Sequence, residues 1–432
     1  MRDRKFGFDT LCLHAGQIPD AATGARALPI YQTTSFVFDS ADHAASLFNL
    51  QTFGNVYSRI SNPTVAALEE RVAALEGGRA ALAAATGMAA QMLALLTLCR
   101  NGDHVVASST LYGGTYSQLA VTFAQFGIEA TFVDADDPEA FRRALKANTK
   151  ALYAETIGNP QLNVCDIAGL AEVAHAAGIP LVIDNTLASP YLCRPFEHGA
   201  DIVIHSVTKY LGGHGTTMGG VVVESGKFPW DNGNFPQMTE PSRGYHGVRF
   251  FETFGDFGFT MKARMETMRT LGPTLSPFRA CLLLQGIETL HLRMPRHCDS
   301  ALAVARHLAA HPLVEWVRYP LLEGDRYASV AQRYLPRGAG GILTFGIKGG
   351  KHSGAKAGER FIEAVQFLSH LANVGDAKSL VIHPASTTHR QLNEDEQRAA
   401  GVTPEMIRLS VGLESPDDIL WDLDQALEQS RQ

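Results

Sequence analysis

The sequence has no cysteine motif, no membrane-length apolar run and no block of like charge. Its six cysteines are scattered without a C-x-x-C pair, which argues against a disulfide framework and against a zinc site. No segment approaches the roughly 20 apolar residues of a membrane span, and the positively charged N-terminus lacks the apolar core of a signal peptide. These absences predict a cytoplasmic protein with reduced thiols.

The charge balance also limits the partners. The formal net charge of −7 comes from residues spread along the chain, so neither a nucleic acid nor an anionic membrane is expected as a partner. We expect chemistry on small molecules instead. The 432 residues, 45% of them hydrophobic, are enough for two domains with a large core.

The N-terminal region differs from the rest of the chain. Residues 1–60 lack a sustained hydrophobic period and are rich in Gly, Thr, Ser and Asn, so we expect an arm that needs a partner surface. Asn62 and Pro63 then form a helix start signal, and apolar residues at helical spacing run to a stop at Gly77. This pattern predicts an amphipathic helix.

Between Ala80 and Val223, short apolar strands alternate with helical stretches. Strands without polar alternation are typical of a mostly parallel sheet covered on both faces, so the predicted fold class is α/β. Ligands of such sheets bind at the carboxyl ends of the strands. The expected strands are residues 104–108, 129–133, 150–155, 180–184, 201–206 and 219–223.

The C-terminal half has a different pattern. Residues 226–275 are irregular and aromatic, and two interpretations stay open: a packed insertion, or a loop that shapes the active-site entrance or a subunit contact. From residue 276 to 432, helical and strand-like segments alternate, which predicts a smaller α+β domain. The expected organisation is an arm (1–60), a ligand-binding domain (61–275) and a C-terminal domain (276–432).

Lys209 lies in the segment HSVTKYLGGHG, directly after an expected strand, so it would project from the carboxyl edge of the sheet. A lysine on a glycine-flanked loop is commonly just solvated. Ser206 and Thr208, however, flank it with hydroxyls, and a desolvated lysine beside hydroxyl donors and a phosphate is what pyridoxal phosphate (PLP) chemistry needs. We interpret Lys209 as a Schiff-base lysine.

Two further features suit the same cofactor. Asp184 ends the expected strand PLVID and would either cap a turn or keep a pyridinium nitrogen protonated. Thr86 and Gly87 open a helix after an apolar run. Free amides at such a helix start bind phosphate, although many small-residue turns also precede helices.

Four more candidates have ordinary alternatives. Tyr57 and Arg59 stand just before the first helix, where Arg59 would either bind a phosphate in a bidentate manner or lie on the surface. Tyr112 follows a strand and would either stack on an aromatic cofactor or belong to the core. Arg408 alternates with apolar neighbours in MIRLSVGLE, and an inward arginine needs an anion such as a substrate carboxylate.

Taken together, these segments resemble the PLP-dependent Cys/Met metabolism enzymes over nearly the whole chain. The similarity rests on YSRISNPT, TLYGGTY, VIDNT, HSVTKYLGGHG, IHPASTTH and RLSVGLES. It implies PLP fold type I, with an N-terminal arm, a large PLP-binding domain and a small C-terminal domain, in homotetramers built from dimers with shared active sites. The region from Leu11 to Thr64 and the long insertion resemble the O-acetylhomoserine sulfhydrylase branch.

The resemblance implies a role for each residue that matches a family motif. Lys209 would bind PLP and shuttle protons, Asp184 would pair with the pyridine nitrogen, and Tyr112 would stack on the ring and take part in proton transfer. No metal site is implied. The implied phosphate ligands are Gly87, Met88, Ser206 and Thr208, joined by Tyr57 and Arg59 from the neighbouring subunit.

The resemblance also implies the substrate and the reaction. Arg408, helped by Ser379 and Asn159, would bind the substrate α-carboxylate. The branch carries out a γ-replacement, in which O-acetylhomoserine plus sulfide or a thiol gives homocysteine or methionine plus acetate. Thr86 replaces the serine of many members but keeps the hydroxyl, whereas Gly114 stands where methionine γ-lyases typically carry cysteine, which counts against a dedicated lyase.

Other reactions stay open at this level. Cystathionine γ-synthase, O-succinylhomoserine sulfhydrylase and γ-elimination share the first half of the chemistry, so the sequence fixes neither the acyl group nor the choice of sulfide over methanethiol. A non-catalytic PLP-binding protein is disfavoured, because the chain retains the whole set of family site residues: Lys209, Asp184, Tyr57, Arg59, Tyr112 and Arg408. A Rossmann-type oxidoreductase is disfavoured because no G-x-G-x-x-G follows the first strand at a helix start.

Overall fold

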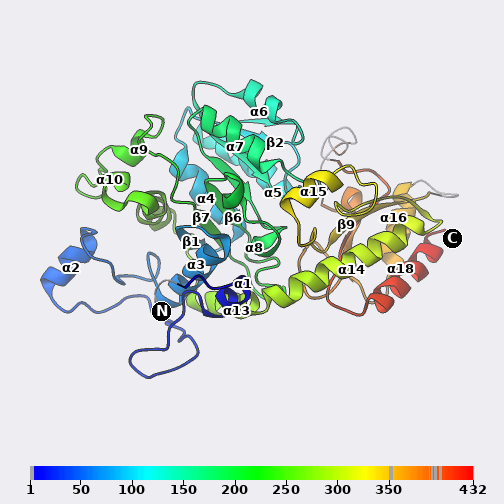
Figure 1. Cartoon of the computed structure of the whole chain (residues 1–432), viewed down its shortest axis with the longest axis horizontal. Coiled ribbons are helices and arrows are strands. Elements are labelled where there is room, and N and C mark those ends of the chain that lie inside the picture. Colours follow the sequence, from blue (N-terminus) through cyan, green and yellow to red (C-terminus); the bar gives the residue numbers. More distant parts are fainter. Residues whose placement is uncertain are drawn as a thin grey trace.

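The protein contains a larger and a smaller sheet, connected in part by the long helix α14 (Leu290–Ala310), which runs from one to the other (Figure 1). The computed structural model describes residues 4–349, 354–388, 390, 393, 397 and 401–431. His389, the last residue of the IHPASTTH motif, lies outside the described residues.

The larger sheet has seven strands in the order β1-β7-β6-β5-β4-β2-β3. β7 runs antiparallel to both of its neighbours, and the other pairs are parallel. The connection from β6 to β7, residues 206–219, contains no helix, and a parallel pairing would need a longer crossover. The strands are β1 (Ala80–Ala84), β2 (His104–Ser108), β3 (Glu129–Val133), β4 (Thr149–Glu155), β5 (Leu181–Asp184), β6 (Ile202–His205) and β7 (Gly220–Glu224).

The α/β fold class expected from the sequence is confirmed. Every residue of β2 and of β7 is buried, which requires cover on both faces of the sheet. The six expected strands are present, with ends that shift by one residue at most. β1 is not among the expected strands because its sequence AALAA is poor in β-branched residues. The helices that pack on this sheet are α3 (Pro63–Glu76), α4 (Gly87–Leu98), α6 (Pro138–Ala144) and α7 (Ile167–Ala176).

The predicted first helix is confirmed as α3. Asn62 Oδ1 accepts the backbone N–H of Thr64 at 3.0 Å, and Pro63 occupies the first turn, where no intrahelical donor is needed. Gly77 ends the helix with a φ of 73°, a left-handed conformation that glycine adopts without a steric penalty.

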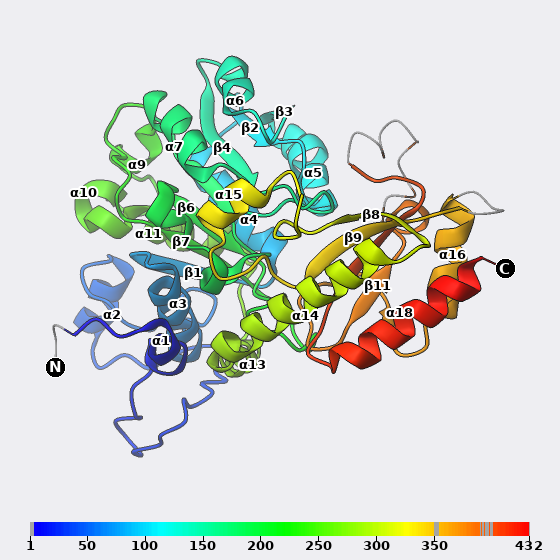
Figure 2. The same cartoon turned by 45° about the vertical axis from the view of Figure 1, so that its right-hand side comes forward.

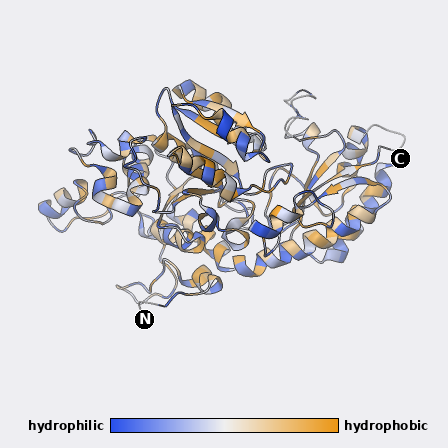
Figure 3. Cartoon of the chain, turned by 45° about the horizontal axis from the view of Figure 1, so that its top comes forward, coloured by the Kyte–Doolittle hydropathy of each residue, from blue (hydrophilic) through white to orange (hydrophobic). Residues whose placement is uncertain are grey.

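The smaller sheet has the order β10-β11-β12-β9-β8, in which only the β10-β11 pair is parallel. Figure 2 shows α14 and α18 (Pro416–Ser430) side by side along it, and Figure 3 shows polar and apolar residues alternating along these long helices. The remaining elements of this part are β8 (Val314–Arg318), α15 (Ala328–Tyr334), β9 (Ile342–Ile347), α16 (Gly354–Ala364), β10 (Ser369–His370), β11 (Leu380–Ile382) and β12 (Met406–Ser410).

The aromatic segment 226–275 forms a packed insertion, the first of the two interpretations. Part of the segment joins the main core, for example through Trp230 and Phe259, and the rest forms a separate hydrophobic cluster. The role of the segment at the entrance or in a subunit contact stays a prediction. The cluster contains Tyr245, Phe250, Phe254, Met261 and Met265. The helices of this segment are α9 (Pro236–Thr239), α10 (Phe250–Phe254), α11 (Gly258–Lys262) and α12 (Arg269–Leu271), with a π-helical turn at Ala263–Met268.

The N-terminal arm leaves apolar side chains in contact with water. Helix α1 packs on α3 and on α13, but Val37 is 96% exposed, Ile18 is 78% exposed and Phe53 is 74% exposed. These side chains agree with an arm that needs a partner surface. The domain boundaries after residues 60 and 275 stay predictions. The short helices not yet named are α1 (Phe8–His14), α2 (Ala41–Phe48), α5 (Gly113–Ser117), α8 (Ser189–Leu192) and α13 (Pro277–Glu288).

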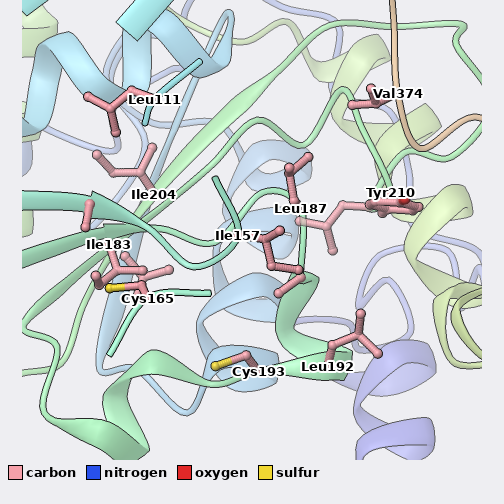
Figure 4. Close-up of a cluster of buried hydrophobic side chains, with 14 of the residues drawn as sticks. Leu111, Ile157, Cys165, Ile183, Leu187, Leu192, Cys193, Ile204, Tyr210 and Val374 are labelled. Carbon is pink, nitrogen blue, oxygen red and sulfur yellow. The ribbon is translucent and has the colours of Figure 1, made fainter. Parts of the chain in front are cut away.

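A hydrophobic cluster lies where several strands of the larger sheet end (Figure 4). Leu111 follows β2 and Ile157 follows β4, while Ile183 and Ile204 lie in β5 and β6. Tyr210, which is fully buried, belongs to the same cluster. The loops that follow β2, β4, β5 and β6 therefore begin at closely packed hydrophobic residues. No helix of the described ranges is both long and apolar enough to cross a membrane.

The cap of α3 can be tested by mutation. Asn62 also donates from Nδ2 to the carbonyl of Tyr31 at 2.8 Å and to Ser58 Oγ at 3.0 Å. We expect Asn62→Ala to lower the free energy of unfolding by about 1–2 kcal/mol, because a cap and two partly buried hydrogen bonds are lost. Asn62→Asp keeps the cap acceptor and should lose less. Thermal unfolding measures both, and an unchanged Tm for Asn62→Ala would contradict this account.

Candidate active site

The carboxyl ends of three neighbouring parallel strands present functional groups at one edge of the larger sheet. β4 ends at Glu155, β5 ends at Asp184, and β6 is followed by Ser206. Glu155 pairs in register with Asp184. Because parallel strands end at the same edge, residues far apart in the chain share one site.

Lys209 lies in the loop after β6, as the sequence predicts, and is largely buried. Its Nζ donates to Asn373 Oδ1 at 2.6 Å. Burial, and then the positive charge of Arg408, lowers the pKa of Lys209 to about 8. An amine that changes protonation near neutral pH can act both as a nucleophile toward an aldehyde and as a proton shuttle.

The backbone next to Lys209 is held by residues of the C-terminal part of the chain. Tyr210 is fully buried, and its hydroxyl accepts the N–H of Gly341 from the smaller part of the protein at 2.8 Å. Arg293 of α14 is also buried and donates to the Tyr210 carbonyl at 2.8 Å. The loop that carries Lys209 is therefore held by α14 and by the segment before β9.

Asp184 is held by the residue two positions after it. Both the N–H and the hydroxyl of Thr186 donate to Asp184 Oδ1, and Thr186 Oγ1 in turn accepts the N–H of Ser206 at 2.8 Å. Burial raises the pKa of Asp184, and the bonds from Thr186 oppose that rise. A buried carboxylate at this position can accept a hydrogen bond from a protonated ring nitrogen.

The start of α4 forms a narrow cradle beside Ser206. Thr86 Oγ1 accepts the N–H of Ala89 at 3.0 Å and caps the helix, which leaves the amides of Gly87 and Met88 to a ligand. A Cβ at Gly87 would lie 2.6 Å from Ser206 Cβ, so only glycine allows this close approach. Such a cradle suits a phosphate.

Thr208 lies on the neighbouring backbone of the β6–β7 connection. Its Oγ1 exchanges hydrogen bonds with the backbone of Gly219, with distances of 3.1 and 3.2 Å. Gly220 in turn touches the start of α4, where an added Cβ would lie 2.1 Å from the Thr86 carbonyl oxygen. The structure thus brings the predicted phosphate residues of this chain, Gly87, Met88, Ser206 and Thr208, around one helix start.

Arg408 reaches the site from β12 of the smaller sheet. It is only 8% exposed, and its guanidinium donates to Asn159 Oδ1 at 3.1 Å. Burial lowers the pKa of Arg408 to about 10. None of the ion pairs within the described ranges includes Arg408, so this buried cation has no carboxylate partner among those residues. A substrate carboxylate would supply the missing charge.

Ser379 lies near this end of the smaller sheet, but its polar groups are engaged within the protein. Its hydroxyl donates to Glu414 Oε2 at 2.8 Å and accepts the N–H of Gly412 at 2.9 Å. Its backbone N–H donates to the other oxygen of Glu414 at 2.6 Å. These hydrogen bonds connect Ser379 with Glu414 and Gly412 and fix the backbone there. Direct contact of Ser379 with a substrate stays a prediction.

Tyr57 and Arg59 contact the packed insertion in the single chain. Arg59 lies over the Tyr57 ring at 5.2 Å and donates to the carbonyl of Arg269 at 3.0 Å. Tyr112, by contrast, stands at the start of α5, is 52% exposed, and donates its backbone N–H to Glu155 Oε1 at 2.6 Å. Tyr112 therefore lies at the sheet edge that carries Asp184, and the Tyr57–Arg59 pair lies on the arm, while the roles of these three residues stay predictions.

Two polar residues of the site are absent from the sequence-based prediction. Glu155 carries a signal in retrospect, since it ends a buried strand in the same way as Asp184. Asn373 has no such signal, because it lies in a loop and its contact with Lys209 spans 164 positions. Among the described residues, no group of three or more His, Cys, Asp or Glu side chains is arranged to hold a metal ion.

The chain is similar to known proteins over nearly its full length. The family model for Cys/Met metabolism PLP-dependent enzymes matches residues 9–428. An O-acetyl-L-homoserine sulfhydrylase of Leptospira meyeri is 55% identical, over 98% of this chain and 97% of the relative. A homocysteine synthase of Schizosaccharomyces pombe is 52% identical, over 98% of each chain.

A solved structure has nearly the same fold. The protein, from Campylobacter jejuni and assigned as an O-acetylhomoserine (thiol)-lyase, superposes with a TM-score of 0.94 at 40% identity, over 98% of this chain and 100% of that one. It contains N'-pyridoxyl-lysine-5'-monophosphate, a lysine joined to the cofactor. The lysine, the carboxylate and the phosphate cradle described above fit the same group.

The lowered pKa of Lys209 gives a pH dependence that can be measured. In protein freed of cofactor, the neutral amine should increase as the pH rises through about 8. Competitive labelling of amines between pH 6 and 10, followed by mass spectrometry, reports this for Lys209, with the exposed Lys378 as reference in the same digest. If the labelling of Lys209 and Lys378 had the same pH dependence from pH 6 to 10, a buried environment for Lys209 would be contradicted.

Proposed function

Since the chain belongs to the family of Cys/Met metabolism PLP-dependent enzymes, we propose that it converts O-acetyl-L-homoserine and sulfide into homocysteine and acetate. The observation that carries this function is the convergence of Lys209 and Arg408 from separate sheets. Arg408 reaches Asn159 in the loop after β4, and Lys209 lies in the loop after β6 at the same edge of the larger sheet, so an amino acid whose carboxylate binds Arg408 would bring its Cα toward the amine. The reaction belongs to methionine biosynthesis.

The cofactor is pyridoxal 5'-phosphate, which supplies an electron sink for charge that develops on the bound amino acid. We assign Lys209 as the residue that holds it covalently and Asp184 as the partner of its ring nitrogen. Tyr112 is assigned as the residue that would stack on the ring. The phosphate contacts are assigned to Gly87, Met88, Ser206 and Thr208, and to Tyr57 and Arg59 of a second subunit.

The protein's part in the reaction is orientation and proton movement. Arg408 and Asn159 hold the α-carboxylate, with Ser379 bracing the backbone beside them. Lys209, once released as a free amine, removes a proton from the substrate and later returns one. The Cγ–O bond breaks with its electron pair on acetate, and hydrosulfide supplies the pair for the new Cγ–S bond.

Gly114 favours replacement over a dedicated elimination. A Cβ at this position would lie 2.5 Å from Tyr112 Cε1, so any larger residue would require Tyr112 to move. Cystathionine γ-synthase, O-succinylhomoserine sulfhydrylase and γ-lyase activities remain the alternatives that an assay must separate, because they share the same residues for the first proton transfer.

We further propose a cytoplasmic homotetramer, a dimer of dimers, with an arm (1–60), a PLP-binding domain (61–275) and a C-terminal domain (276–432). Support comes from the exposed apolar side chains of the arm, Ile18, Val37 and Phe53, and from the display of Tyr57 and Arg59 on the same segment. Pairing would cover the apolar side chains and bring the Tyr57–Arg59 pair to another subunit's cofactor.

The function is tested by the products. PLP-loaded protein given O-acetyl-L-homoserine should form homocysteine only when sulfide is present, with little α-ketobutyrate. Lys209→Ala should abolish turnover, since neither the covalent attachment nor the base remains, while Lys378→Ala serves as a matched surface control. Sulfide-independent α-ketobutyrate would point instead to a lyase, and the absence of any product to a different homoserine ester.

The role of Arg408 is tested by substrate affinity. Arg408→Ala removes a charge-assisted contact worth about 2–3 kcal/mol, so KM for the amino acid should rise by roughly 30- to 160-fold. Arg408→Lys keeps the charge without the bidentate geometry and should recover part of the loss. Cofactor content, read from visible absorbance, controls for folding. A wild-type KM in Arg408→Ala would refute the carboxylate role.

A further inference from the structure

Glu155 is a buried carboxylate that none of the assigned roles uses. It ends β4, is 6% exposed, and pairs in register with Asp184 on β5. Burial, and then the negative charge of Asp184, raises the pKa of Glu155 well above its usual range. A carboxyl group in such a place is costly unless its oxygens receive hydrogen bonds.

Its partners are peptide groups rather than a cation. The N–H of Tyr112 donates to Glu155 Oε1 at 2.6 Å, and the backbone of Asn159 also opposes the rise in the pKa of Glu155. None of the ion pairs found in the described part of the chain includes Glu155. Short bonds from N–H groups to a carboxylate are among the stronger hydrogen bonds in proteins, and they fix the geometry of the donors.

The two peptide groups belong to the two loops that meet over the site. Tyr112 opens the helix after β2, and Asn159 lies in the loop after β4, where its side chain accepts from Arg408 at 3.1 Å. The loops are closely packed, since a Cβ at Gly158 would lie 3.1 Å from the carbonyl oxygen of Thr110. Glu155 thus stands at the point where the stacking ring and the carboxylate-binding arginine are connected.

We propose that Glu155 is a positioning residue, which sets the Tyr112 ring and, through Asn159, the Arg408 guanidinium for the same amino-acid substrate. The property that matters for this role is the length of the Glu155 side chain, which brings its carboxyl group to the two peptide groups. A residue of equal length that still accepts a hydrogen bond should therefore replace it better than a shorter residue that keeps the charge. This role rests on the proposed function for its kinetic consequence only.

Two conservative variants separate the effect of the length of the Glu155 side chain from the effect of its carboxylate. Glu155→Gln keeps the length and a carbonyl acceptor, and should leave KM for O-acetyl-L-homoserine within about threefold of wild type. Glu155→Asp keeps the carboxylate but shortens the side chain by one methylene, and should raise KM by at least about tenfold, with cofactor content unchanged, because Tyr112 and Arg408 lose their shared support.

Amide hydrogen exchange provides a readout that does not depend on catalysis. In the PLP-loaded protein without substrate, exchange at the Tyr112 N–H should be at least about tenfold faster in Glu155→Asp than in wild type, and close to wild type in Glu155→Gln. If wild-type protein formed no homocysteine, the proposed function would fail, while this exchange measurement would still decide the role of Glu155.

Asp422 provides a matched control in the smaller domain. It is fully buried and also accepts backbone N–H groups, from Gln366 at 2.8 Å and from Phe367 and Leu368 at 3.0 Å. Asp422→Asn should lower Tm but leave KM and Tyr112 exchange unchanged. Wild-type KM and exchange in Glu155→Asp, or an impaired Glu155→Gln beside a normal Glu155→Asp, would overturn the proposal.

Discussion

Four charged side chains give up most of their contact with water at one edge of the larger sheet: Lys209, Asp184, Glu155 and Arg408. Burial of charge is costly, and direct ion pairing would be the simplest way to reduce that cost. The structure instead gives each group a neutral partner. Since none of the ion pairs in the described ranges joins the four, the charges of Lys209, Asp184 and Arg408 stay available to a cofactor and a substrate.

The neutral partners differ from one charge to the next. Asp184 receives the N–H and hydroxyl of Thr186, and Glu155 receives the N–H of Tyr112. Lys209 donates to Asn373, and Arg408 donates to Asn159. Neutral dipoles of this kind orient the charged groups without cancelling them, which is the preorganisation that catalysis requires.

This arrangement depends on a rigid support beneath the edge. A buried network underlies the ends of β5 and β6, in which Asn185 donates to Glu76 at 2.8 Å and His205 pairs with the same carboxylate at 2.5 Å. On the other side, Arg293 and Gly341 fix Tyr210 and hence the backbone of Lys209. The larger and smaller domains therefore share the task of placing one amine.

The sequence by itself determined the α/β fold, the ends of six strands to within one residue, and the places of Asp184 at the end of its strand and of Lys209 after the next strand. Those features depend on local patterns: apolar runs, caps and turn residues act within a few positions of themselves. It did not determine the antiparallel direction of β7 or the contacts of Asn373 and Glu155. Only the tertiary structure decided these, because they depend on which strands lie side by side and on bonds between residues as far apart as Lys209 and Asn373.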